Sequence, residues 1–68
     1  MTPRQLACLQ AHLATGSTKG AAEVLGIAPA TVAAHLQGAR MRLGVDTTEQ
    51  TVAVLVSRGS LTVPEWRS

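Results

Sequence analysis

The chain has 68 residues, of which 46% are hydrophobic and 15% charged, and its formal net charge is +2. A chain of this length has room for one small domain, because it buries only about 60% of the surface that its unfolded form exposes. The apolar share excludes an intrinsically disordered chain, and no apolar run approaches the roughly 18 residues of a membrane span. Since the N-terminus also lacks the pattern of a secretion signal, we expect a cytoplasmic protein that does not bind membranes. The weak positive charge permits an anionic partner without requiring one.

The first helix is predicted to begin at Pro3. Thr2 and Gln5 have the spacing of a capping box, and Pro3 falls at the first helical position, where its missing N–H group is harmless. Gly16 ends the helix as a left-handed cap. The only cysteine, Cys8, cannot form an internal disulfide, so we interpret it as a small buried hydrophobe. The apolar face of this helix consists of Leu6, Leu9 and Leu13.

A second helix, with the sequence TKGAAEVL, follows the capping residue Ser17 and ends at Gly26. A third helix begins at Pro29 and ends at Gly44. The link between them, LGIAP, has a glycine at its bend, and the alanines of the second helix are short enough to let the two helices cross closely. Residues from about 18 to 38 therefore predict a helix-turn-helix arrangement. The apolar stripes are Ala21, Ala22 and Leu25 on the second helix and Val32, Leu36, Ala39 and Leu43 on the third.

A fourth helix is predicted to open with a second capping box, Thr47 and Gln50, and to end at Gly59. Residues 60–68 alternate apolar and polar side chains around a proline, so we expect a short extended C-terminal tail. A domain this small has little core left for the side chains of that tail. The sequence thus predicts an all-α fold with four helices within residues 2–59. The apolar residues here are Val52, Ala53, Leu55 and Val56 in the helix and Leu61, Val63 and Trp66 in the tail.

Four motifs in order resemble the LuxR-type (GerE-like) helix-turn-helix domain. They are TPRQ at 2–5, S-x-K-x-x-A-x-x-L-G-I at 17–27, TV-x-x-H-L at 31–36 and RLGV at 42–45. The resemblance runs without gaps from Thr2 to about Arg58. It implies a four-helix domain that binds double-stranded DNA, with the third helix in the major groove, the second helix against the phosphates and the fourth helix pairing with its twin in a homodimer. The function it implies is sequence-specific transcription regulation at an inverted-repeat site.

The same resemblance assigns the DNA-binding residues. His35 stands at the family's characteristic histidine, where it either packs and hydrogen-bonds at the helix boundary or contacts a phosphate or base. The chain departs from the family at Ala33, where a lysine is usual, and the missing charge should weaken the attraction to the DNA backbone. It departs again at Gly20, where a glutamate is usual. The other assigned positions are Ser17, Thr18 and Lys19 for phosphate, and Ala30, Thr31, Ala33, Ala34, Gln37 and Gly38 for the groove.

The third helix is unusually poor in hydrogen-bonding side chains for a helix that reads bases. Its alanine and threonine methyl groups can pack against thymine methyl groups, Gln37 can pair with adenine, and Arg40 or Arg42 can hold phosphate or guanine. We therefore expect a preference for A·T steps. The alternative is a helix-turn-helix module that binds protein, for example a phage or host regulator or RNA polymerase. A basic stripe of Lys19, Arg40 and Arg42 beside this helix would favour DNA, and an apolar patch there would favour protein.

The fourth helix carries more apolar surface than one core-facing stripe requires. We expect Val54, with parts of Ala53 and Thr51, to point away from the core and to form a twofold contact, to which the apolar residues of the tail could add. An isolated exposed valine is also an ordinary feature of monomers, so this assignment rests largely on the resemblance. The residues assigned to the dimer are Thr51, Val54, Leu55 and Arg58.

Nothing in the sequence indicates an enzyme. The two histidines lie on different predicted helices, neither is at metal-binding spacing with Cys8, and the four carboxylates are scattered along the chain. We expect no catalysis, cofactor, metal or small-molecule ligand. Because Met1 lies one residue before the first cap, we expect a stand-alone domain, controlled by its abundance, by dimerisation or by a partner. A fragment of a larger regulator would have the same sequence, and a phage origin is a hypothesis that no residue supports.

Overall fold

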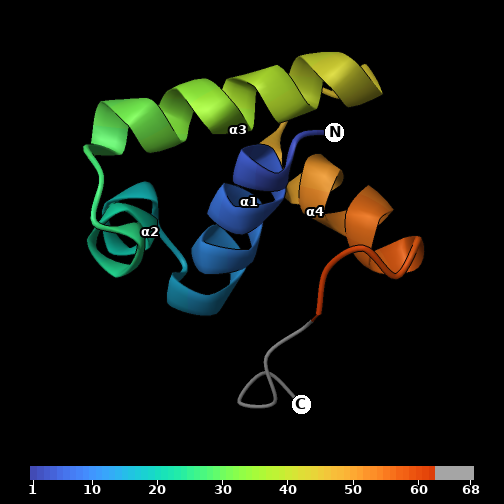
Figure 1. Ribbon diagram of the computed structural model, residues 1–68. Coiled ribbons are helices and arrows are strands. Elements are labelled where there is room, and N and C mark those ends of the chain that lie inside the picture. Colours follow the sequence, from blue (N-terminus) through green and yellow to red (C-terminus); the bar gives the residue numbers. More distant parts are fainter. Residues whose placement is uncertain (63–68) are drawn as a thin grey trace.

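Four helices follow one another in the computed structural model, which describes residues 1–62. They are α1 (Pro3–Thr15), α2 (Thr18–Leu25), α3 (Pro29–Leu43) and α4 (Thr48–Ser57). Figure 1 shows α3 lying across the other three helices, with α2 beneath its N-terminal part, α4 beneath its C-terminal part and α1 between them. The described residues contain no strand, so the predicted all-α fold with four helices is confirmed.

The helices begin where local side chains can satisfy their first N–H groups. At α1 the Gln5 N–H donates to Thr2 Oγ1 over 3.1 Å while the Thr2 N–H donates to Gln5 Oε1 over 3.0 Å, as a capping box requires. Thr47 and Gln50 form the same reciprocal pair at α4. Gly16 follows α1 in the left-handed conformation, with φ of 81°. These predicted starts and the end of α1 are confirmed.

The core lies where α1, α2 and α3 meet. Cys8 is completely buried, which raises the pKa of its thiol, and the nearby Arg4 charge lowers it to a smaller extent. On α2 only Ala21 and Ala22 are buried, and their short side chains allow α2 to pack closely against α1 and α3. The buried apolar cluster consists of Cys8, Leu9, Ala11, Ala21, Ala22, Val32, Leu36, Ala39, Leu55 and Leu61.

Two expectations about the C-terminal part of the chain were wrong. Thr51 is 0% exposed and its hydroxyl donates to the Thr47 carbonyl over 3.0 Å, so it faces the core and does not point away from it. Leu61 is only 6% exposed and belongs to the core. Gly59 explains why: with φ of 77° it turns the chain back, so that the Ser60 N–H reaches the Leu55 carbonyl at 2.8 Å.

The packed part of the protein therefore continues past residue 59. Gln10 of α1 holds Thr62 through two hydrogen bonds: the Gln10 amide nitrogen donates to the Thr62 carbonyl over 2.9 Å, and the Thr62 N–H donates to Gln10 Oε1 over 3.1 Å. Of the expected extended tail, Leu61 and Thr62 therefore belong to this packed part. Val63 and Trp66, which were expected to cover a partner subunit, lie outside the described residues.

Candidate nucleic-acid interface

The outward face of α3 carries a line of exposed side chains that follows the helical repeat. Ala30, Ala34, Gln37 and Met41 are separated by four, three and four residues, so they lie above one another on one side of the helix. All four are exposed, and Met41 is 75% exposed. We call these four residues the outer strip. Sequence reasoning missed Met41, although its spacing of four residues from Gln37 was the signal that could have found it.

Thr31 and Ala33 flank the outer strip and are also exposed. The predicted groove-facing track is therefore accessible at five of its six positions, the exception being Gly38. This glycine is half-buried, and a Cβ built on it would lie 2.8 Å from Gln5 Nε2. Since Gln5 is already engaged in the cap of α1, the start of α1 approaches α3 closely at this point. The structure thus places Gly38 against α1 and apart from the outer strip.

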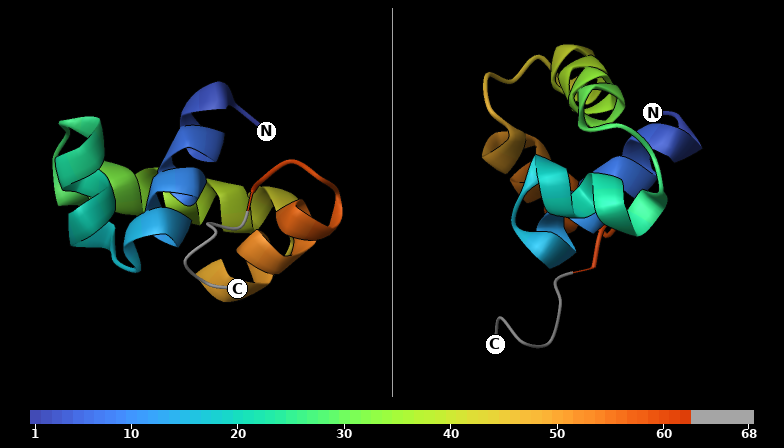
Figure 2. Two further views of the ribbon diagram at one scale, coloured as in Figure 1. Left: turned by 90° about the horizontal axis from the view of Figure 1, so that it is seen from below. Right: turned by 90° about the vertical axis from the view of Figure 1, so that its left-hand side faces the viewer.

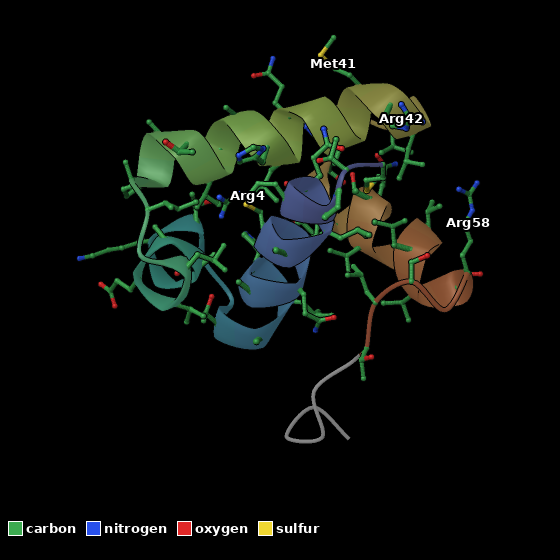
Figure 3. The ribbon with its side chains drawn as sticks, in the orientation of Figure 1. Arg4, Met41, Arg42 and Arg58 are labelled. Carbon is green, nitrogen blue, oxygen red and sulfur yellow. The ribbon has the colours of Figure 1, made fainter. Side chains whose placement is uncertain are left out.

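The two arginines at the end of α3 differ in their surroundings. Arg40 is half-buried, and its Nη1 donates to the Thr48 hydroxyl over 3.2 Å, which directs its guanidinium toward the start of α4. Arg42 is exposed. Figure 3 shows Arg42 at the C-terminal end of α3 and Arg58 at the far end of α4. Of the two arginines predicted to contact DNA, only Arg42 presents its charge freely at the surface.

The start of α2 offers a second anchor point. Ser17 Oγ accepts the Gly20 N–H at 2.9 Å and keeps its own O–H available as a donor. Lys19 is exposed and Thr18 half-buried. Gly20 cannot carry a side chain without displacement, because an added Cβ would lie 2.7 Å from Thr15 Cβ. The first turn of α2 has no acidic residue, so the positive end of this helix is not neutralised there.

Lys19, Arg40 and Arg42 therefore do not form a single basic stripe beside α3. The outer strip is uncharged, and α3 contains no acidic residue. Lys19 belongs to α2, which lies beneath the N-terminal part of α3, while Arg42 is at the C-terminal end of that helix. Because 15 residues of helix span about 22 Å, Lys19 and Arg42 do not lie together. Arg4, at the start of α1, and Arg58, after α4, are exposed as well. His35 is half-buried beside it.

The residues assigned to a twofold contact are not all on the surface. Thr51 and Leu55 are 0% and 4% exposed and belong to the interior of the domain. Val54 is half-buried and Arg58 is exposed. The structure thus leaves Val54 and Arg58 as the members of this set that another molecule could reach.

Residues 1–62 contain no group of three histidine, cysteine, aspartate or glutamate side chains placed to hold a metal ion. None of the four helices is both long and apolar enough to cross a membrane within the part of the chain that the structure describes.

The short turn between α2 and α3 makes these two helices a helix-turn-helix pair, and the exposed face of α3 is free of acidic residues. A family model described as bacterial regulatory proteins, luxR family, matches residues 1–56. The chain belongs to this family, and the resemblance seen in its sequence motifs is confirmed.

Curated relatives are considerably longer than this chain. It is 39% identical over 66 residues to the HTH-type quorum sensing-dependent transcriptional regulator VjbR of Brucella ovis, and equally to that of Brucella abortus. The alignment covers 96% of this chain and 25% of each relative. The chain therefore spans a quarter of the length of these transcription regulators.

Proposed function

We propose that the protein is a sequence-specific transcription regulator that binds double-stranded DNA through α3 in the major groove. The observation that carries this proposal is the outer strip: an exposed, acid-free line of mostly small side chains on the second helix of a helix-turn-helix pair. A major groove about 12 Å wide admits an α-helix. Short side chains let the axis of such a helix lie deep in the groove, close to the base edges.

Readout by this helix would combine one amide with several apolar groups. Gln37 is the only residue of the outer strip with hydrogen-bonding groups in its side chain, and a glutamine can pair in bidentate fashion with adenine. Ala30, Ala34 and Met41 supply apolar surface, which suits the C5-methyl groups of thymine. A helix with this composition favours sites rich in A·T pairs.

Phosphate contacts would fix the helix at its two ends. The N–H groups at the start of α2, with the Ser17 hydroxyl and the Lys19 ammonium, suit one phosphate. Arg42 suits another at the opposite end of α3. This arrangement positions α3 without placing a charge in the strip that faces the bases. A protein of this kind acts in the cytoplasm, where the bacterial chromosome lies. It binds DNA and does not catalyse a reaction.

The proposed dimer uses the accessible part of α4. Val54 and Arg58 form its contact surface, while Thr51 and Leu55 support it from within. A twofold axis through α4 would set two copies of α3 about 34 Å apart, one turn of DNA, and the site would be an inverted repeat. The surface is small, so DNA would contribute to pairing by holding both copies.

Protein binding is the second candidate function, and Met41 is the observation that favours it. A methionine that is 75% exposed on an uncharged helical face suits an apolar groove on another protein. Fluorescence polarisation with random duplex DNA at 50 and 200 mM salt separates the two functions. A DNA-binding protein shows binding that weakens steeply with salt. Absence of binding at the lower salt concentration would reject the proposed function.

A further inference from the structure

A hollow of about 410 Å³ lies where the C-terminal ends of α3 and α4 meet the start of α1. It is open to solvent, and Figure 2, in its left-hand view, shows the first residues of the chain beside the segment that follows α4. Two arginines and a serine supply its polar groups, and leucine side chains supply apolar wall. These lining residues are Arg42, Arg58 and Ser60, with Leu6, Leu43 and Leu55. We call it the Arg42–Arg58 hollow.

The two guanidinium groups of this hollow bring positive charge to one place from two different helices. Arg42 belongs to the last turn of α3 and Arg58 stands at the C-cap of α4, and both are exposed. Within residues 1–62, no acidic side chain lines the hollow. Among the arginine side chains of the same described residues, only that of Arg40 donates a hydrogen bond. The hollow therefore presents two cations beside apolar surface.

We propose that the Arg42–Arg58 hollow binds an acidic segment of a partner protein, one that carries carboxylate side chains next to apolar ones. A guanidinium can bind a carboxylate through two parallel N–H···O hydrogen bonds, and such charge-assisted bonds are stronger than neutral ones. The Ser60 hydroxyl can donate a further bond. Leu6 and Leu43 are half-buried and offer contact to apolar side chains. A peptide with both kinds of side chain matches this wall.

The position of Arg58 favours protein over DNA as the source of the anion. A duplex seated on the outer strip lies along the outward face of α3, beside Arg42. Figure 3 shows Met41 of the outer strip pointing away from α4, whereas Arg58 lies below the level of α3, at the end of α4. A DNA phosphate also has no apolar part, so the leucines of the hollow would gain no contact from it.

An acidic segment in the hollow would oppose DNA binding. Arg42 is the proposed phosphate contact at the end of α3, and its guanidinium would be engaged by the carboxylate of the partner. Arg58 belongs to the proposed dimer contact and would be engaged as well. The partner would therefore weaken DNA binding, and DNA would weaken binding of the partner by the same factor. This consequence rests on the proposed function, whereas docking of the partner does not.

Selection from a random peptide library displayed on phage, with the parent protein as bait, tests the docking directly. The selected peptides should be rich in aspartate and glutamate next to apolar residues. Their affinity, measured by fluorescence polarisation, should fall by about 10- to 100-fold in Arg58→Glu, the effect of losing one charge-assisted hydrogen bond. Arg58→Ala should also weaken binding, so the result does not depend on a reversed charge at the helix end. A selection without enrichment of acidic peptides would overturn the proposal.

Arg4→Glu is the matched control for Arg58→Glu. It makes the same charge reversal at another exposed arginine, one that does not line the hollow. Arg4→Glu should retain most of the affinity for the selected peptides, because only the net charge of the protein changes. Equal losses in the two variants would show that the peptides respond to net charge alone and would overturn the proposal. Circular dichroism would verify that the variants retain their helices.

Measurements with a half-site duplex separate this proposal from the proposed function. Arg58→Ala should keep the salt dependence of the parent, and a slope reduced by about one unit would place a DNA phosphate in the hollow and overturn the proposal. A selected peptide should weaken binding of the duplex to the parent and have less effect on Arg58→Ala. A peptide that binds without changing the affinity for the duplex would contradict the competition. Absence of DNA binding by the parent would reject the proposed function, while the peptide selection would still decide whether the hollow binds acidic segments.

Discussion

Arg40 and Arg42 provide the sharpest test of the DNA interface, because they are two residues apart in the sequence but differ in exposure and in hydrogen bonding. Arg42 is exposed at the end of α3, whereas Arg40 is half-buried and bound to Thr48. Each phosphate contact changes the slope of log affinity against log salt by about 0.9. Arg42→Ala should therefore reduce the steepness by about one unit for each copy bound, whereas Arg40→Ala should leave the slope close to that of the parent.

The slope translates into a measurable ratio. Between 50 and 200 mM salt, one phosphate contact accounts for an approximately 3.5-fold loss of affinity, and two contacts in a twofold dimer for an approximately 12-fold loss. In a polarisation titration, the loss of affinity between these two salt concentrations should be smaller for Arg42→Ala than for the parent by this factor. Arg40→Ala should instead lower the free energy of unfolding by about 0.5–1.5 kcal/mol, the contribution of one hydrogen bond. Equal slope changes for the two variants, or no change for Arg42→Ala, would refute the assignment.

The other predictions concern base readout, the core and the dimer. Gln37→Ala should weaken binding to the preferred site by about 1–3 kcal/mol and relax the choice at one base pair, as judged by selection from random sequences; a uniform loss on all sequences would make Gln37 a phosphate contact. Leu61→Ala should lower the free energy of unfolding by about 2–5 kcal/mol in a urea titration, because Leu61 belongs to the buried core. The exposed Val24 is its control, and Val24→Ala should change stability by less than about 0.5 kcal/mol. Val54→Glu should abolish the twofold stoichiometry on an inverted repeat while leaving the affinity for a half-site intact, and an unchanged stoichiometry in sedimentation would contradict a dimer through α4.

The helices could be predicted from the sequence because their boundaries depend on local chemistry. Helix starts depend on side chains within three residues of the cap, as at Thr2 and Thr47, and the end of α1 depends on one glycine in the left-handed conformation. Such interactions do not require the rest of the protein, so the order and type of the four helices followed from the sequence. The exposed members of the outer strip also followed, with the exception of Met41, from helical spacing.

Tertiary packing determined the features that local sequence patterns could not predict. Thr51 faces the core because the packing of α4 against the rest of the domain sets the rotation of the helix, and a threonine in an amphipathic pattern fits either face. Its hydroxyl is satisfied there by the Thr47 carbonyl one turn earlier. Leu61 enters the core because the chain reverses after α4, a path that depends on where α1 and its Gln10 stand.

The candidate nucleic-acid interface also has some features that follow from the local sequence and others that follow from tertiary packing. The sequence alone determined that α3 would be a helix with small outward side chains, because helical spacing and residue size are local properties. Only the tertiary structure decided which neighbours that helix meets: Gly38 lies against Gln5 of α1, and Arg40 is turned to Thr48 of α4. Those contacts join residues 33 and 8 positions apart, and their energies depend on the crossing of helices, which no pattern within one helix records.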